Sequence, residues 1–265
     1  MPFPPSDRVI YAKNPLIEVI CQIRFPTVLR ISTESPTEFQ ERIRQEYPLY
    51  ALQEPSIDVP ALPKEVAALV GGMLKLPTLS ALPTHRFSSR DRQRSISLSQ
   101  DFVALTELRY TRWEDFRTQM KGSVDALEAV YHPAFYTRVG LRYKDLISRR
   151  GLGLDEARWA ELLKSHMLGE LGATEVADEV SGVMTQSTIR LGDIPGAHVK
   201  LNHGLVKRRG SDEDCYLIDS DFAMEAPEGV DEPFAILDRF NRLAGCLFRW
   251  AITDKLHRAM EPVPI

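Results

Sequence analysis

The stretch RVGLRYKDLI at residues 138–147 has the alternating pattern of a β-strand, with cations grouped around a glycine. Alternate side chains of a strand point to opposite faces, so one face carries only polar groups and the glycine. The residues on that face are Arg138, Gly140, Arg142 and Lys144. Arginine forks bind carboxylate or phosphate, and glycine lets a ligand approach closely. The strand therefore predicts an anion-binding or partner-binding surface.

The strand PLIEVICQIRFP near the N-terminus repeats this pattern. Residues 21–25 match residues 139–143 as apolar, variable, apolar, arginine, aromatic, which pairs Arg24 with Arg142. We therefore expect an internal duplication, with halves at 14–135 and 136–262 in one compact unit. The alternative is that these arginines pair with acids on neighbouring strands, such as Glu107.

The order of predicted elements also repeats. Amphipathic helices are expected at 35–48, at 111–131, after Asp155 and from Pro233 to about Met260, and alternating strands fill the intervals. The predicted fold class is α+β, with two pseudo-repeated strand–helix–three-strand–long-helix units. Their curved antiparallel sheets would resemble the TATA-binding protein or a helix-grip fold, as one continuous sheet or as two packed half-domains.

Two segments have more than one interpretation. The proline-rich insertion at 51–83 is a lid hinged at Gly71–Gly72, a docking arm, or a wrap that completes the first core. The last helix is apolar nearly all round, so it is expected to be buried on more than one side. It contacts the other half or forms a homodimer interface.

A second basic patch lies in HRFSSRDRQR at residues 85–94. Its cations are Arg86, Arg90, Arg92 and Arg94. With neighbouring aromatic residues they could follow a nucleic-acid backbone, and a regular strand would place them on one face. The alternative, a solvated hairpin, agrees better with an acidic chain.

Asp219 and Asp221 share a strand face and are the candidate metal ligands or acid–base pair. Further ligands at motif spacing are missing, and Lys200 or Lys207 could pair with them across strands. No nucleotide-binding, metalloprotease or serine-hydrolase motif occurs in the sequence. We therefore predict no cofactor and no complete metal site, and favour a non-enzymatic protein.

Composition restricts the class of protein. The 265 residues carry a net charge of −4, which argues against a general nucleic-acid binder. The N-terminal MPFPPSDR has neither the cationic nor the apolar region of a signal peptide, and charges interrupt the longest apolar helix. These features predict a cytoplasmic protein without a membrane span.

The sequence resembles a sporadically distributed family of uncharacterised prokaryotic proteins. The matching segments are YAKNPLIEVICQIRFP, DFVALTELRYTRWEDF, RVGLRYKDLI and ITDKL, in the same order along the chain. Lys144-Asp145 departs from the family pattern of an apolar residue and Asn. The resemblance implies no reaction or catalytic residue, and the patchy distribution points to a defence or toxin-neutralising system.

The leading hypothesis is a binding protein that recognises a protein or an anionic ligand through the basic strand face. The alternative is an enzyme that acts on a phosphate-containing or nucleic-acid substrate with the same face and the two aspartates.

Overall fold

The computed structural model describes residues 2–53, 83–208 and 210–264. Its strands, in chain order, are β1 (Val9–Tyr11), β2 (Leu16–Arg24), β3 (Leu49–Gln53), β4 (Thr84–Ser88), β5 (Arg94–Ser99), β6 (Phe102–Glu107), β7 (Arg138–Ser148), β8 (Val183–Arg190), β9 (Ala197–Lys207), β10 (Asp214–Glu225) and β11 (Pro262–Pro264). Its α-helices are α1 (Arg30–Thr33), α2 (Thr37–Ile43), α4 (Trp113–Tyr131), α5 (Arg149–Leu152), α6 (Trp159–Leu162), α7 (Pro233–Ala251) and α8 (Asp254–Ala259). Within these ranges, no helix has the length and apolarity to cross a membrane.

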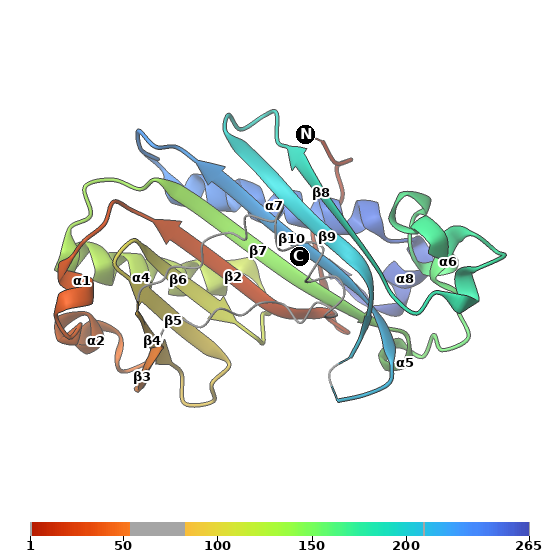
Figure 1. The fold of residues 1–265 in the computed structure, drawn as a ribbon, viewed down its shortest axis with the longest axis horizontal. Helices are drawn as coiled ribbons and strands as arrows, with labels where there is room; N and C mark the ends of the chain where they lie inside the picture. The colour runs from red at the N-terminus through yellow and green to blue at the C-terminus, as the bar shows by residue number, and fades with distance from the viewer. Residues whose placement is uncertain (1, 54–82, 209, 265) are drawn as a thin grey trace, which may run out of the picture.

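Nine strands form one antiparallel sheet in the order β3-β4-β5-β6-β2-β7-β10-β9-β8. The two strands with the matching pattern, β2 and β7, are neighbours at its centre (Figure 1). The sheet is therefore continuous, as one of the two predicted arrangements required, and α+β is the observed fold class. A second, two-stranded sheet joins β1 to β11.

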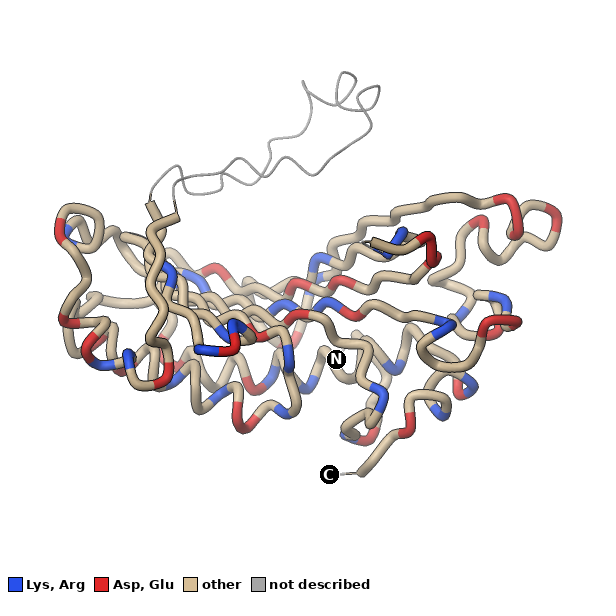
Figure 2. The backbone as a smooth tube through the Cα atoms, turned by 90° about the horizontal axis from the view of Figure 1, so that it is seen from below, with Lys and Arg blue, Asp and Glu red and all other residues tan. Residues whose placement is uncertain are grey.

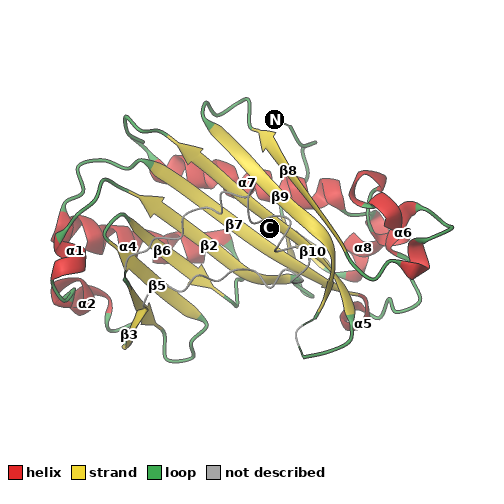
Figure 3. Ribbon diagram, in the orientation of Figure 1, coloured by secondary structure: helices red, strands yellow, loops and turns green. Residues whose placement is uncertain are grey.

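The long helices α4 and α7 lie on the same side of the sheet (Figure 3). Ring contacts from α2, α6 and α7 reach the same side of β4 and β10, namely Phe39–Phe87, Trp159–Tyr216 and Phe240–Phe222. The apolar half of each strand faces these helices, because its alternate residues are the buried ones. We call the opposite side of the nine-stranded sheet the open face.

Three expected helices differ from the structure. The helix expected at 35–48 is shorter, because α2 ends at Ile43. The helix after Asp155 is only the short α6, followed by 3-10 turns at Ser165–Met167 and Gly169–Gly172. The expected helix to Met260 ends at Ala251, and α8 starts anew because the Thr253 hydroxyl caps it by accepting from the Leu256 N–H. The proposals for 51–83 concern residues outside the described ranges, apart from Pro83 and the last residues of β3.

The apolar residues of α7 are covered within the chain itself. One side packs on the sheet, and the N-terminal segment lies along another side, with Phe3 against Trp250 and Tyr11 against Phe248. Helix α7 also contacts α4 of the first half, where Asp238 accepts from Trp113 and Arg117, so the predicted contact with the other half is confirmed. The homodimer interface stays a prediction.

Gly204 of β9 lies where the edge strand β8 approaches most closely. A Cβ added there would be 1.9 Å from the Val183 carbonyl oxygen. Gly204→Ala should therefore displace the start of β8 and lower the free energy of unfolding by about 1–3 kcal/mol. Urea denaturation measures the change.

The matched control is Gly122→Ala in the middle of α4, where the added methyl group meets open space. Better helix propensity should stabilise this variant by up to about 1 kcal/mol. Equal stability of Gly204→Ala and the wild type would contradict the close packing of β8.

Candidate functional site

The open face carries the polar residues that the sequence placed on β2 and β7. The register sets Gln22 opposite Gly140, Arg24 opposite Arg138, and Ile20 opposite Arg142. All of these side chains lie on the same face, because paired residues of neighbouring strands point the same way. The sheet is seen edge-on in Figure 2, with cations and acids interspersed along its strands. The predicted residues are therefore brought onto one surface.

Arg142 is held by a carboxylate on β10. Its Nε and Nη2 donate to the two oxygens of Asp219 over 2.7 and 2.5 Å, and Asp219 is 5% exposed. The partner is diagonal, since Arg142 lies directly opposite Asp221. A bidentate pair of this kind fixes the guanidinium plane. Arg142 is thus oriented by the protein itself.

Arg138 lies across Gly140. A methyl group at Gly140 would be 2.6 Å from Arg138 Nη1, which shows that the guanidinium occupies the space that the missing side chain leaves. From there Nη1 donates to Gln22 Oε1 over 2.9 Å, and Nη2 is 3.9 Å from an Asp221 oxygen. The glycine therefore admits a neighbouring arginine side chain in this structure, where the sequence had predicted close approach of a ligand or another backbone.

The remaining predicted cations also have acidic neighbours. Lys144 forms an ion pair with Glu18 of β2, and Arg24 Nη1 is 3.5 Å from Asp101. Glu107, the acid suggested by the sequence, is on the other face, because it pairs with Val19 and Arg94. The expectation of cross-strand neutralisation is correct in kind, but the acids differ.

The open face also has cations without such partners. Arg86 on β4, Arg190 on β8 and Lys200 on β9 form no ion pair with any described residue, and the last two are exposed. Their neighbours across the strands, Ser97 for Arg86 and His198 for Arg190, place them on the open face. These three cations lie to either side of the paired group at the centre.

The second basic patch does not form one surface. Arg86 is in β4, Arg90 and Arg92 are in the connecting turn, and Arg94 begins β5. Arg94 is opposite Glu107 on the helix side, whereas Arg86 is on the open face. The turn interrupts the strand alternation, so the arginines do not line up as a nucleic-acid track.

Asp219 and Asp221 share the open face, as their spacing predicted. Their contacts are with Arg142 and Arg138 of β7, and Lys200 lies opposite Asp221 without an ion-pair contact. Burial raises the pKa of Asp221, and the two arginines oppose that rise. Among the described residues, no group of three or more His, Cys, Asp or Glu side chains could hold a metal ion.

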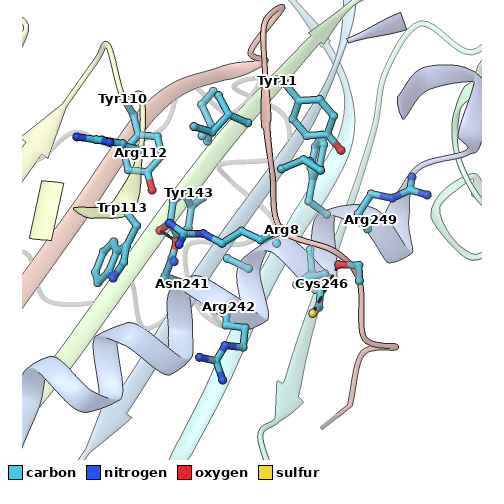
Figure 4. Close-up of a pocket in the computed structure, with 18 of the residues that line it drawn as sticks. Arg8, Tyr11, Tyr110, Arg112, Trp113, Tyr143, Asn241, Arg242, Cys246 and Arg249 are labelled. Atoms are coloured by element: carbon cyan, nitrogen blue, oxygen red, sulfur yellow. Dashed lines mark hydrogen bonds between the residues drawn. The ribbon is translucent and has the colours of Figure 1, made fainter. Parts of the chain in front are cut away.

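A cavity of about 540 Å³ lies on the helix side of the sheet, and no motif had pointed to it. It is bounded by the N-terminal segment from Ser6 to Tyr11, the turn before α4, the sheet centre and α7 (Figure 4). Its size is within the usual range for small-molecule sites.

Asp145 of β7 lines this cavity and is 7% exposed. In the described part of the chain its carboxyl has no hydrogen-bond donor and no cation partner. Burial, with a smaller effect of the Asp219 charge, raises the pKa of Asp145 to about 8. A sequence signal for this residue existed, because Asp145 has the same parity as the buried Tyr143 and Ile147.

The chain has no match among protein-family models or among curated proteins. The resemblance to the prokaryotic family therefore stays a prediction. The fold and the geometry define an α+β protein with two candidate binding regions, one on each side of a single sheet.

Arg142→Ala should lower the free energy of unfolding by about 1–3 kcal/mol, because it leaves the buried Asp219 carboxylate without its donor. Removing both partners with Arg142→Ala/Asp219→Ala should recover part of the loss. A double-mutant cycle in urea gives the coupling energy, and a value of zero would contradict the pairing.

Asp145→Asn should change how stability depends on pH. With a pKa near 8 in the folded state and an ordinary one near 3.8 when unfolded, the folded wild type binds the extra proton between these values. Its stability therefore falls as pH rises through this window, by up to about 1.4 kcal/mol per pH unit from this group. The amide variant lacks that contribution.

The measurement is urea denaturation of both proteins from about pH 4 to about pH 8. The stability of Asp145→Asn relative to the wild type should rise steadily across the range. A constant difference would show that Asp145 titrates normally in the folded protein.

Proposed function

We propose that this chain is a binding protein that recognises an acidic protein surface through the open face of its sheet. The observation that carries the proposal is the set of unpaired cations on that face, Arg86, Arg190 and Lys200, in a chain with a net charge of −4. Cations concentrated on one face of an acidic protein give that face a field of opposite sign.

The central pairs have a different role in this proposal. Arg138 and Arg142 are only 20% and 36% exposed as side chains, and their forks are engaged with Gln22, Asp221 and Asp219. They hold β2, β7 and β10 in register and keep the surface rigid. The outer cations remain free to contact a partner, and rigid presentation lowers the entropic cost of binding.

The dimensions of the open face favour a protein over a small anion. Neighbouring strands are about 4.8 Å apart, so nine strands span roughly 40 Å. Interfaces of standard size bury about 800 Å² on each partner, which a surface of this width can supply. The charge arrangement supports an acidic patch on that partner, because complementary charges set orientation and the rate of association.

We also infer that the two halves arose by internal duplication, as the matching strands suggested. The pairing of β2 with β7 supports a duplication. The sequence match makes Gln22 equivalent to Gly140, and these two residues also lie opposite each other in the two strands. The next pairs on either side are Cys21 with Leu141 and Ile23 with Val139. Replacing each residue by its equivalent in the other strand turns one of these pairs into the other. A local two-fold axis through the Gln22–Gly140 pair would have this property. The strand order on the two sides of β2 and β7 supports it too, with β6 and β5 on one side and β10 and β9 on the other.

The test is a charge reversal at exposed positions without ion pairs. Arg190→Glu/Lys200→Glu should weaken binding to poly-L-glutamate, used as an acidic polypeptide, at least tenfold at low ionic strength, since each close charge contact is worth about 1 kcal/mol or more. Fluorescence anisotropy of the labelled polymer measures the affinity, and added salt should weaken it.

The control is Arg42→Glu/Arg258→Glu, which makes the same change of net charge with exposed cations of α2 and α8. We expect this pair to retain most of the affinity, and both pairs to keep the wild-type melting temperature. Equal weakening by the two pairs would overturn the assignment of the open face. Absence of any binding of poly-L-glutamate by the wild type would also overturn this assignment.

A further inference from the structure

The cavity behind the sheet has a layered construction. Its floor is the sheet centre, with Tyr143 and Asp145 of β7 and Ser220 of β10. Its walls are α7 and the turn before α4, and residues 6–11 cross its front. Several lining groups are apolar, including Leu16, Leu247 and Phe248. A cavity that combines an apolar lining with a few polar groups on a rigid floor is the usual form of a small-molecule site.

Asp145 is the acid on this floor, and no described donor or cation contacts its carboxyl. It is more than nine-tenths buried, and it lines the cavity. A buried carboxyl without a partner costs several kcal/mol in a folded protein, whether charged or neutral. A ligand that brings a positive charge would remove this cost.

Aromatic rings line the cavity on two of its sides. Tyr110 and Tyr143 meet edge-to-face at 5.8 Å, and Tyr11 meets Phe248 edge-to-face at 5.7 Å. Figure 4 shows Tyr110 and Tyr143 on one side of the cavity and Tyr11 on the other. Burial, with a smaller contribution from the Asp145 charge, raises the pKa values of both Tyr11 and Tyr143, so the carboxyl lies close enough to both hydroxyls to act on them. Ring faces attract cations, most strongly where water is excluded.

The charged groups around the cavity are largely neutralised by neighbours. Arg8, Arg112 and Arg249 pair with Glu114, Asp115 and Asp254 in turn, and Asp238 accepts from Trp113 and Arg117. The Arg249 pair is formed by Nη2, while its buried Nη1 has no hydrogen-bond partner among the described residues. Arg242 also lines the cavity and has no described ion pair, and in Figure 4 its guanidinium points away from Tyr11 and Tyr110. Asp7 is exposed, the Cys246 thiol accepts from Ser6, and the Tyr11 hydroxyl contacts His257. None of the arginines contributes to the pKa shift of Asp145.

We propose that this cavity binds a small organic cation, an ammonium-bearing molecule with an apolar body, whose charge is held by Asp145 between the two aromatic pairs. The carboxylate accepts a hydrogen bond from the ammonium group, and the rings of Tyr11 and Tyr143 lie beside its charge. The apolar side chains of Leu16, Leu247 and Phe248 contact the body of the ligand. This site is independent of the open face, because it lies on the other side of the sheet.

The test uses 2-phenylethylamine as the cation and 2-phenylethanol as its neutral counterpart of the same shape. Isothermal titration calorimetry of the wild type should give binding of the amine and at least tenfold weaker binding of the alcohol. Asp145→Asn keeps the shape and a hydrogen-bond acceptor but removes the charge, so it should lose amine binding at least tenfold. This variant is expected to fold, because it removes the buried acid.

A filling variant tests the location of the site. Gly245 of α7 lines the cavity, and an added Cβ there meets open space, so Gly245→Leu should block the amine without unfolding the protein. Gly122→Leu makes the same change at an open position of α4 outside the cavity and should bind like the wild type. Equal binding of amine and alcohol, retained amine binding by Asp145→Asn, or no amine binding by the wild type would each overturn the proposal.

The pH dependence of binding gives a second readout. An aliphatic amine stays protonated between about pH 6 and about pH 8, whereas Asp145 must lose its proton to pair with it. Affinity should therefore rise by up to about tenfold per pH unit over this range in the wild type. The other titratable group in contact with Tyr11 is His257, whose pKa is lowered by burial, so His257→Gln is the control and should keep the rise. Loss of the rise in His257→Gln, or its absence from the wild type, would contradict ionisation of Asp145 on binding.

Discussion

The pairing of β2 with β7 is the interaction on which the rest of the structure depends. These strands are far apart in the chain, and their ladder is what makes one sheet of the strands before residue 108 and those after residue 137. Contacts of such sequence separation carry a large loop-closure cost, so they form only when many apolar residues are buried at once. Here Val19, Cys21, Ile23, Val139 and Leu141 provide that burial on the helix side.

Because strand side chains alternate, the same ladder determines what each side of the sheet can do. One parity supplies the core, and the other supplies the ordered charges of the open face. Asp145 departs from this division, as Arg94 and Glu107 do, and it is a buried acid among core residues. Natural sequences keep such costly groups mainly where they serve a function. The buried Asp145 of β7 therefore supports a ligand site in the adjacent cavity.

Much of the fold and of the open face could be predicted from the sequence, because strand and helix periodicity are local patterns. Contacts between distant segments could not be predicted, because no local pattern encodes them. Alternation in residues 138–147 correctly assigned Arg138, Arg142 and Lys144 to one surface, and the apolar stripe Trp113, Phe116 and Met120 correctly predicted α4. The partners of the arginines could not be predicted, because Arg142 reaches Asp219 diagonally, and only the register shows that. The cavity could not be predicted either, since its walls come from the N-terminal segment, α4 and α7, which no local pattern brings together.

The N-terminal segment that crosses the front of the cavity is held by fewer backbone contacts than the nine-stranded sheet behind it. Residues 9–11 pair only with the three-residue strand β11, and the Tyr11–His257 contact and the exposed Arg8–Glu114 pair add modest support. A short ladder of this kind is expected to open with a much smaller free energy than the central strands of the nine-stranded sheet. Because the segment over the cavity has so few backbone contacts, we expect it to open more readily than the sheet, while the broad charged surface on the far side keeps its shape.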